Sequence, residues 1–281
     1  AALNQGTINV DTTYPDTGKV TEDGFTITNV EPLPSDMISI QQVLTLSLNT
    51  GAVHILSTLG GGQINEQARN TWHDYLVNHY QFGKPTGIEQ SYEASGYVPD
   101  PNNGNALELH YADTAFGQGI SVTMLQMAAA LSSILNGGTY YQPHLVDGTV
   151  NADGTVQSQA PKVVRTGVVK PEVTPEVEQL MEGVYTSNHG LYKSKLYPGY
   201  IIGAKTGTAQ IPINGGYDPN SYNGTFLGFI GGDQPQYVVT VLTKAPKLPG
   251  WEYAGTQAAA PIFGSIANSL ITSGLVSPQS H

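Results

Sequence analysis

The segment 203–209 (Gly-Ala-Lys-Thr-Gly-Thr-Ala) carries a lysine and two hydroxyls within a run typical of a β-strand. Because side chains alternate along a strand, Lys205 and Gly207 are expected on the face opposite Thr206 and Thr208. Gly207 has no side chain, so a ligand or another backbone can come close to the strand there. Such a strand offers a cation, hydroxyls and backbone N–H groups to an anionic substrate. An ordinary half-exposed edge strand is the other interpretation of this spacing.

A phosphate-binding P-loop is excluded for this segment. That motif needs a glycine, four residues and then Gly-Lys-Ser/Thr. Here Ala204 stands between Gly203 and Lys205, so the lysine does not follow a glycine directly.

A second pair of polar side chains, Ser47 and Asn49, lies two residues apart where one helical pattern ends and another begins. A hydroxyl and an amide at such a break can both face a cleft. Capping of the helix ends is the alternative, because Ser and Asn are favoured caps. The position alone leaves both interpretations open.

The histidines and the cysteine count predict no metal site or second catalytic site. The seven histidines show no metal-ligand spacing such as His-Glu-x-x-His, and there is no cysteine. No metal or cofactor is therefore expected. The net charge of −11, from 11 basic and 22 acidic residues, argues against nucleic acid as a partner. No run of 18 apolar residues predicts a membrane span.

The elements that must position these residues are helices first and strands later. Ser39 is the expected N-cap of a helix in which Ile40 and Val43 fall on one face, and Gly51 is expected to interrupt the pattern. Further helices are expected over about 66–80, over 124–136 after Thr123, and to about 187 from an N-cap at Thr174; 88–120 is expected to be mostly loop.

Three β-type runs follow, at 200–211, 225–230 and 237–244, and a last helix is expected over about 258–271. This order predicts an α+β fold, an antiparallel sheet flanked by helices. We expect a mainly helical subdomain over 39–140, and antiparallel strands with a closing helix over 195–281. Only 12% of the 281 residues are charged, about half the usual share of roughly 25%. With 33 Gly and 18 Pro, this suits a loop-rich globule and not a coiled coil.

Ser-x-Asn followed much later by Lys-Thr-Gly makes two of the three sequence signatures of penicillin-binding proteins and serine β-lactamases. The flanking residues resemble the transpeptidase domain of the monofunctional, class B penicillin-binding proteins. The resemblance runs in order over 39–51, 82–88, 117–123, 136–138 and 259–263 and covers nearly the whole of 1–281. It implies that family's fold, with an all-helical subdomain. A serine β-lactamase is a weaker alternative.

The third signature, Ser-x-x-Lys, is absent, because no lysine has a serine or threonine three residues before it. In the family this serine is the acylated nucleophile, on a central helix shortly before the segment that corresponds to residues 1–4. The resemblance therefore implies a domain that lacks its N-terminal part, and a chain that is inactive alone.

The resemblance also implies roles for the two polar segments. Ser47 would pass a proton towards the leaving nitrogen, and Asn49 would hold the acyl side chain and orient the neighbouring lysine. Lys205 would supply positive potential and keep Ser47 in its working state. Thr206 and Thr208 would hold the substrate carboxylate beside Gly207. The Thr208 backbone N–H would be one oxyanion donor.

The implied substrate is a peptidoglycan stem peptide ending in D-Ala-D-Ala, with β-lactams as inhibitors of the complete enzyme. The implied location is the extracytoplasmic face of the bacterial membrane, with an anchor in an N-terminal segment outside this chain. A second polypeptide carrying the Ser-x-x-Lys helix is a further expected partner. The alternative is a non-catalytic module that binds cell-wall peptide or a complementary chain; a proton relay favours the enzyme.

Overall fold

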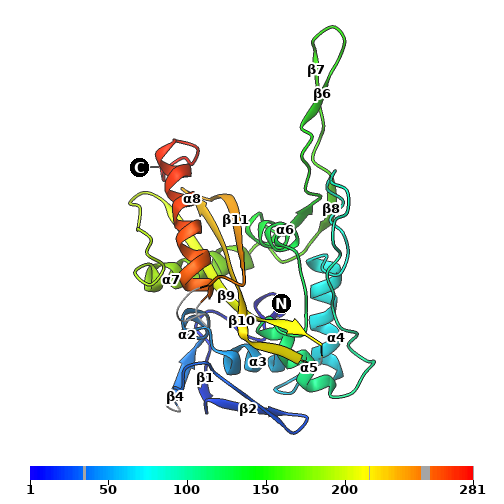
Figure 1. Ribbon diagram of the computed structural model, residues 1–281, viewed down its shortest axis with the longest axis vertical. Coiled ribbons are helices and arrows are strands. Elements are labelled where there is room, and N and C mark those ends of the chain that lie inside the picture. The colour runs from blue at the N-terminus through cyan, green and yellow to red at the C-terminus, as the bar shows by residue number, and fades with distance from the viewer. Residues whose placement is uncertain (34–35, 215, 248–253, 281) are drawn as a thin grey trace.

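A computed structural model of the chain describes residues 1–33, 36–214, 216–247 and 254–280. Its largest sheet contains three antiparallel strands in the order β11-β10-β9 (Figure 1). These strands are β9 (Ile201–Ile213), β10 (Gly216–Gly231) and β11 (Pro235–Lys244). Among the described strands β9 pairs only with β10, so its outer edge is open to a further strand or peptide. The α+β fold with an antiparallel sheet flanked by helices is confirmed.

The helices run along the chain as α1 (Ala2–Gln5), α2 (Ile40–Leu46), α3 (Asn49–Thr58), α4 (Glu66–Asp74), α5 (Leu107–Ala115), α6 (Met124–Leu135), α7 (Val173–Asn188) and α8 (Ala260–Thr272). Two π-helical turns, Tyr75–His79 and Gly255–Ala259, directly continue α4 and precede α8. The short strands are β1 (Thr13–Asp16), β2 (Lys19–Glu22), β3 (Phe25–Thr28), β4 (Asp36–Ser39), β5 (Thr139–Tyr141), β6 (Gly148–Val150), β7 (Val156–Ser158) and β8 (Val163–Thr166). Strands β6 and β7 form a hairpin that projects from the body (Figure 1).

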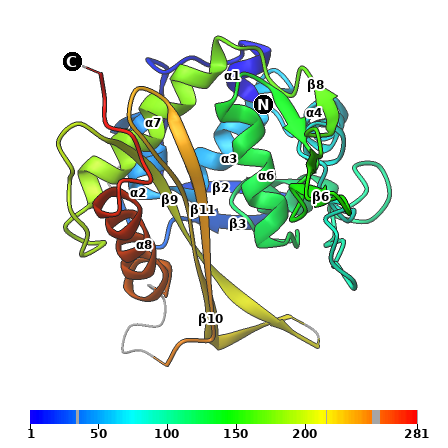
Figure 2. The same cartoon turned by 90° about the horizontal axis from the view of Figure 1, so that it is seen from above.

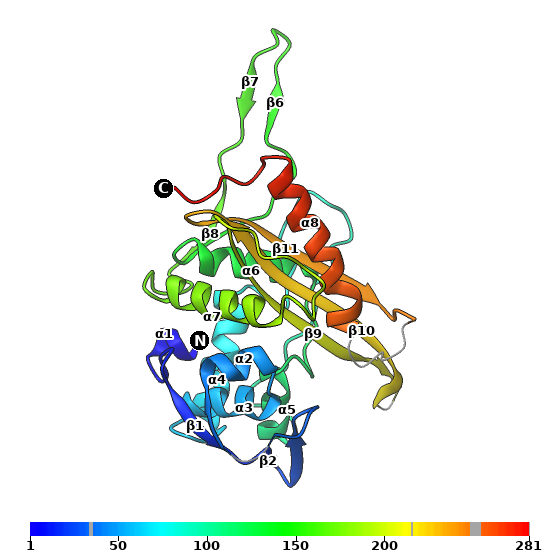
Figure 3. The same cartoon turned by 90° about the vertical axis from the view of Figure 1, so that its left-hand side faces the viewer.

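The three-stranded sheet separates two layers of helices. Helix α8 covers one face, and α6 and α7 cover the other (Figures 2 and 3). Buried Phe226, Ile230 and Phe263 fill the α8 side. On the other side, buried Phe229 packs against Met181 of α7 and against α6. Burial on both faces fixes the register of β9, because a slip of one residue would exchange its two faces.

Two helices begin at the residues expected from the sequence, Ser39 and Thr123. The Ser39 hydroxyl accepts a hydrogen bond from the Gln42 N–H, and the Gln42 side chain accepts one from the Ser39 N–H. Thr123 and Gln126 form the same capping box before α6. Each box satisfies two N–H groups that the helix itself leaves unpaired.

Three local expectations were wrong. Gly51 lies inside α3 instead of ending a helix, and it is there because a Cβ would lie 2.7 Å from a Val43 methyl carbon. Helix α7 begins at Val173, so Thr174 is not its N-cap; its hydroxyl donates to the Ile134 carbonyl. Helix α5 was missed because it follows Ala106, a left-handed residue with no capping side chain. The division into a 39–140 subdomain and a 195–281 part stays a prediction.

Candidate functional site

Lys205 and Ser47 meet at the junction between the sheet and the helices. The Lys205 ammonium donates one hydrogen bond to the Ser47 hydroxyl, at 2.7 Å, and another to the carbonyl of Thr206, at 3.0 Å. An ammonium group has donors only, so the Ser47 oxygen is the acceptor. The hydroxyl hydrogen of Ser47 must then point away from Lys205, which leaves it available for a third group.

Ser47 occupies a backbone conformation that is unusual for its type. It ends α2 with φ 57° and ψ 54°, in the left-handed region. Its N–H donates to the Leu44 carbonyl, and the Leu48 N–H donates to the Val43 carbonyl. These bonds satisfy the last carbonyls of α2. A non-glycine residue there carries a strain of about 1–3 kcal/mol and persists only where its surroundings hold it.

Helix α7 holds α2 against β9 and thereby brings Ser47 to Lys205. The Gln41 amide of α2 donates to the Leu180 carbonyl of α7, at 3.1 Å, and the Asn188 amide of α7 donates to the Thr45 carbonyl, at 3.0 Å. Gly183 permits this approach, because a Cβ there would lie 2.7 Å from the Gln41 amide nitrogen.

The contact between α7 and β9 is equally close. At Gly203 an added Cβ would lie 2.9 Å from the Met181 Cβ of α7 and would overlap the Phe229 ring. Gly203 is therefore required by packing. Two residues further along β9, Lys205 extends from the same face of the strand towards α2.

Burial changes the protonation of Lys205. It lowers the pKa of this lysine to about 8, because desolvation penalises the charged form. At pH 7 about one molecule in ten then holds a neutral lysine, and the rest hold the ammonium. The group is charged enough to attract a carboxylate at pH 7 and can also exchange its proton near neutrality.

Asn49 lies in the first turn of α3, two residues after Ser47. Its amide nitrogen donates to the Thr28 carbonyl at the end of β3, at 3.0 Å. The structure thus brings Ser47 and Lys205 together, while the Asn49 amide is tied to the strand beneath it.

Thr206 and Thr208 face the α8 side of the sheet, opposite Lys205 and Gly207. The Thr208 hydroxyl accepts a hydrogen bond from the Gly255 N–H, at 3.1 Å. The Thr206 hydroxyl interacts with that of buried Tyr192. Both hydroxyls thus have partners within the protein, on the face of the strand opposite Lys205.

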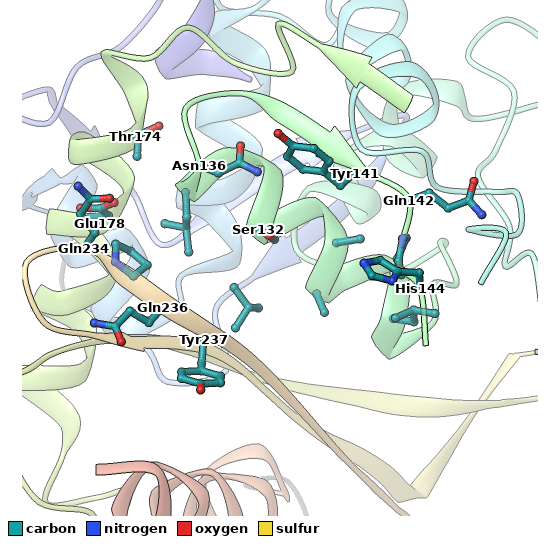
Figure 4. A pocket seen from close by; sticks show the side chains of 17 residues that line it. Ser132, Asn136, Tyr141, Gln142, His144, Thr174, Glu178, Gln234, Gln236 and Tyr237 are labelled. Carbon is teal, nitrogen blue, oxygen red and sulfur yellow. The ribbon is translucent and has the colours of Figure 1, made fainter. Parts of the chain in front are cut away.

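A separate pocket lies away from these residues. It has a volume of about 630 Å³ and opens between α6, residues 141–144, the start of α7 and the start of β11 (Figure 4). Ser132, Asn136, Glu178 and Tyr237 are among its lining residues, and none of the six site residues expected from the sequence lines it. This pocket therefore does not mark the candidate site.

The described residues contain neither a cluster of metal ligands nor a membrane-spanning helix. No group of three or more His, Asp or Glu side chains there is arranged to hold a metal ion. No helix in that part of the chain is both long and apolar enough to cross a membrane.

The sequence did not predict a buried polar network that lies next to this site. Asp16 and Thr50, 6% and 1% exposed, hydrogen-bond each other at 2.7 Å. Asp16-Thr17-Gly18 is by itself a turn-forming run, and the Gly18 N–H donates to the Asp16 carboxylate. No sequence pattern links Asp16 to a residue 34 positions away.

Known proteins resemble this chain over nearly its full length. Stage V sporulation protein D of Bacillus subtilis is 31% identical over 242 residues, which cover 85% of this chain and 35% of that protein. Penicillin-binding protein PbpB of Mycolicibacterium smegmatis is 28% identical over 281 residues, covering 96% of this chain and 41% of that protein. The chain thus spans well under half the length of these relatives.

The fold has solved counterparts as well. A crystal structure of penicillin-binding protein 3 from Mycobacterium tuberculosis, complexed with ampicillin, is 25% identical and superposes with a TM-score of 0.83. The match covers 100% of this chain and 61% of that one. The family model for the penicillin-binding protein transpeptidase domain matches residues 1–268. The resemblance seen at Ser-x-Asn and Lys-Thr-Gly is thereby confirmed, and the chain belongs to the penicillin-binding protein transpeptidase domain family.

Proposed function

We propose that this chain is part of a peptidoglycan D,D-transpeptidase and carries the proton-relay and substrate-binding side of its active site. The hydrogen bond between Lys205 and Ser47 is the observation that carries the proposal. A module that only binds a peptide needs no such relay. Family membership and a relative named as a peptidoglycan D,D-transpeptidase support the same function.

The proposed reaction proceeds through an acyl-enzyme. A serine hydroxyl attacks the penultimate D-Ala carbonyl of a stem peptide, the bond to the last D-Ala nitrogen breaks, and that nitrogen takes up a proton as D-Ala leaves. An amine from a neighbouring strand then attacks the ester carbonyl, which releases the serine and forms the cross-link. Nucleophile and proton relay must lie within hydrogen-bond reach of each other.

Ser47 suits the proton-transfer step because of its bond to Lys205. The ammonium fixes the Ser47 oxygen as an acceptor, so its own hydrogen is directed to the leaving nitrogen. The proton that Ser47 gives up is replaced by the one that the attacking serine hydroxyl loses. Lys205 stabilises the oxygen while it is short of a proton, and Asn49 would hold the acyl side chain.

The open edge of β9 suits the substrate. An extended peptide can add to an exposed strand edge through main-chain hydrogen bonds. We place the terminal carboxylate towards Lys205 and the segment Thr206, Gly207 and Thr208, with the Thr208 N–H as one oxyanion donor. Loss of one such donor typically lowers the rate about 100- to 1000-fold.

The nucleophile lies outside these 281 residues, because they contain no Ser-x-x-Lys. We propose that it comes from a Ser-x-x-Lys helix, carried either by the same polypeptide or by a second one. We place the complete protein at the extracytoplasmic face of the membrane, where its peptidoglycan substrate lies, with an anchor segment outside this chain.

Labelling with a fluorescent penicillin tests the proposal. The 281-residue chain alone is expected to form no covalent adduct. The same chain joined after a segment that carries a Ser-x-x-Lys helix is expected to be labelled. A hybrid with that serine changed to alanine is the matched control. A folded hybrid that stays unlabelled, or labelling of the chain alone, would contradict the proposal.

A further inference from the structure

Ser47 lies between two helices whose starts depend on the same strand. Strand β1 pairs with β4, with Tyr14 opposite Ile38, and β4 leads directly into α2. The Ile40 N–H, at the start of α2, donates to the Thr12 carbonyl before β1. The start of α2 is therefore fixed relative to β1.

The start of α3 is fixed to β1 through a buried chain of hydrogen bonds. The Asn29 amide donates to the Thr50 hydroxyl, at 2.9 Å, and the Thr50 hydroxyl donates to the Asp16 carboxylate, at 2.7 Å. Asp16 also accepts hydrogen bonds from the Tyr14 hydroxyl, at 2.8 Å, and from the Gly18 N–H, at 2.7 Å. Every donor on this carboxylate comes from a different residue, which fixes its orientation.

Helix α3 needs this network because it has no cap of its own. Its N-cap residue, Leu48, supplies no side-chain hydrogen bond, and Leu48 is buried against Tyr14 and Val43. The Thr50 N–H, which the helix leaves unpaired, donates to the Asn29 side chain at 3.1 Å. A carboxylate bound to the first turn also interacts favourably with the helix dipole.

The charge state of Asp16 fits this function. Burial raises its pKa, but the hydrogen bonds from Thr50, Gly18 and Tyr14 outweigh that effect and hold the pKa below its ordinary value. The carboxylate is therefore ionised at neutral pH and accepts each of these bonds.

Only the short segment Ser47-Leu48 separates α2 from α3, so fixing both helix starts also fixes the strained turn. We propose that Asp16, acting through Thr50, is a positioning residue that holds Ser47 in its left-handed conformation opposite Lys205. The importance of Asp16 for catalysis rests on the proposed function. The claim that Asp16 fixes the position of Ser47 relative to Lys205 does not.

The test is an NMR comparison of matched variants of the 281-residue chain. Thr50→Val removes the hydroxyl and keeps the shape. We expect loss of the nuclear Overhauser contact between the Ser47 β-protons and the Lys205 ε-protons. We also expect a Ser47 one-bond Cα–Hα coupling that no longer indicates positive φ. Asp16→Asn is expected to do the same, and Thr50→Ser, which restores a hydroxyl, is expected to rescue both signals.

The control is Thr58→Val, the same substitution at the other end of α3. The Thr58 hydroxyl bonds to the Ile55 carbonyl and to Thr7, far from the turn. This variant is expected to lose stability and to keep the Ser47 signals. If Thr50→Val and Asp16→Asn lose stability yet keep the Ser47–Lys205 contact, Asp16 has a structural role only and the inference is overturned.

A second measurement needs no variant. In the unmodified chain, the Leu48 N–H bonds to Val43 and the Thr50 N–H to Asn29. If the Asp16–Thr50 network fixes the turn between α2 and α3, both amides are expected to exchange with solvent through one shared opening event. Independent exchange of the two amides would overturn the inference even if the variants fail to fold. None of these measurements depends on acylation. A failure of the proposed function can therefore be told apart from a failure of this inference.

Discussion

The Lys205 ammonium lies 2.7 Å from the Ser47 hydroxyl, although the two residues are 158 positions apart in sequence. Each comes from a different structural unit, a strand of the sheet and the end of a helix. Helix α7 joins these units through close contacts at Gly183 and Gly203. The relay geometry is therefore a product of packing as much as of the two side chains.

Stability should rise with pH across the range in which partly buried Lys205 loses its proton. Its pKa of about 8 lies below the roughly 10.4 of an unfolded chain. Between these values the unfolded chain binds more protons, so the free energy of unfolding increases with pH. Below about pH 8 the lysine is charged in both states, and its unfavourable contribution is constant.

Urea unfolding of the wild type and of Lys205→Met, at about pH 7.5, 8.5 and 9.5, measures this effect. The wild type is expected to gain stability relative to the variant as the pH rises. A difference between the two that stays constant with pH would contradict the assigned pKa.

The close contact of α7 with β9 should make Gly203 intolerant of any side chain. In Gly203→Ala the new Cβ would lie 2.9 Å from the Met181 Cβ and would overlap the Phe229 ring, which is fully buried. We expect a loss of about 1–3 kcal/mol in the free energy of unfolding, the usual effect of overpacking.

Gly190→Ala is the matched control, because no atom lies within 4 Å of its added Cβ. Its stability should stay within about 0.5 kcal/mol of the wild type. Equal stability of the two variants in urea unfolding would show that the α7–β9 contact is looser than described.

A peptide carrying the Ser-x-x-Lys helix should stabilise the chain. A ligand that binds only the folded state raises its stability by mass action, by about 2.7 kcal/mol at 100 times Kd. We expect the melting temperature to rise with peptide concentration. A scrambled peptide of the same composition is the control; an equal response to both would show non-specific binding.

The sequence predicted the elements that carry the site better than it predicted their junctions. The N-cap at Ser39, the helix that starts after Thr123 and the three long strands are local patterns, and the structure confirms them. Helix α5 and the position of Gly51 depend on tertiary contacts, which no local pattern reveals. At Gly51 the requirement is the approach of Val43 and Tyr14.

The site itself was predicted only through family resemblance. Spacing alone left Ser47 as either a helix cap or a cleft residue, and the structure shows that it is both a helix end and a partner of Lys205. The Asp16–Thr50 bond could not be predicted, because it joins a turn to a helix start by tertiary packing.

The central claim is that Lys205 and Ser47 act together as the relay of a transpeptidase. The most direct test is the acylation rate of the hybrid carrying Ser-x-x-Lys, measured by intact mass during incubation with benzylpenicillin. We expect Lys205→Met and Ser47→Ala each to lower this rate roughly 100- to 1000-fold, as loss of a preorganised electrostatic contact does. We expect the double variant to lose little more, because both residues serve one step. The exposed Lys195→Met should leave the rate unchanged. Acylation of the folded Lys205→Met hybrid at the unmodified rate would contradict the claim.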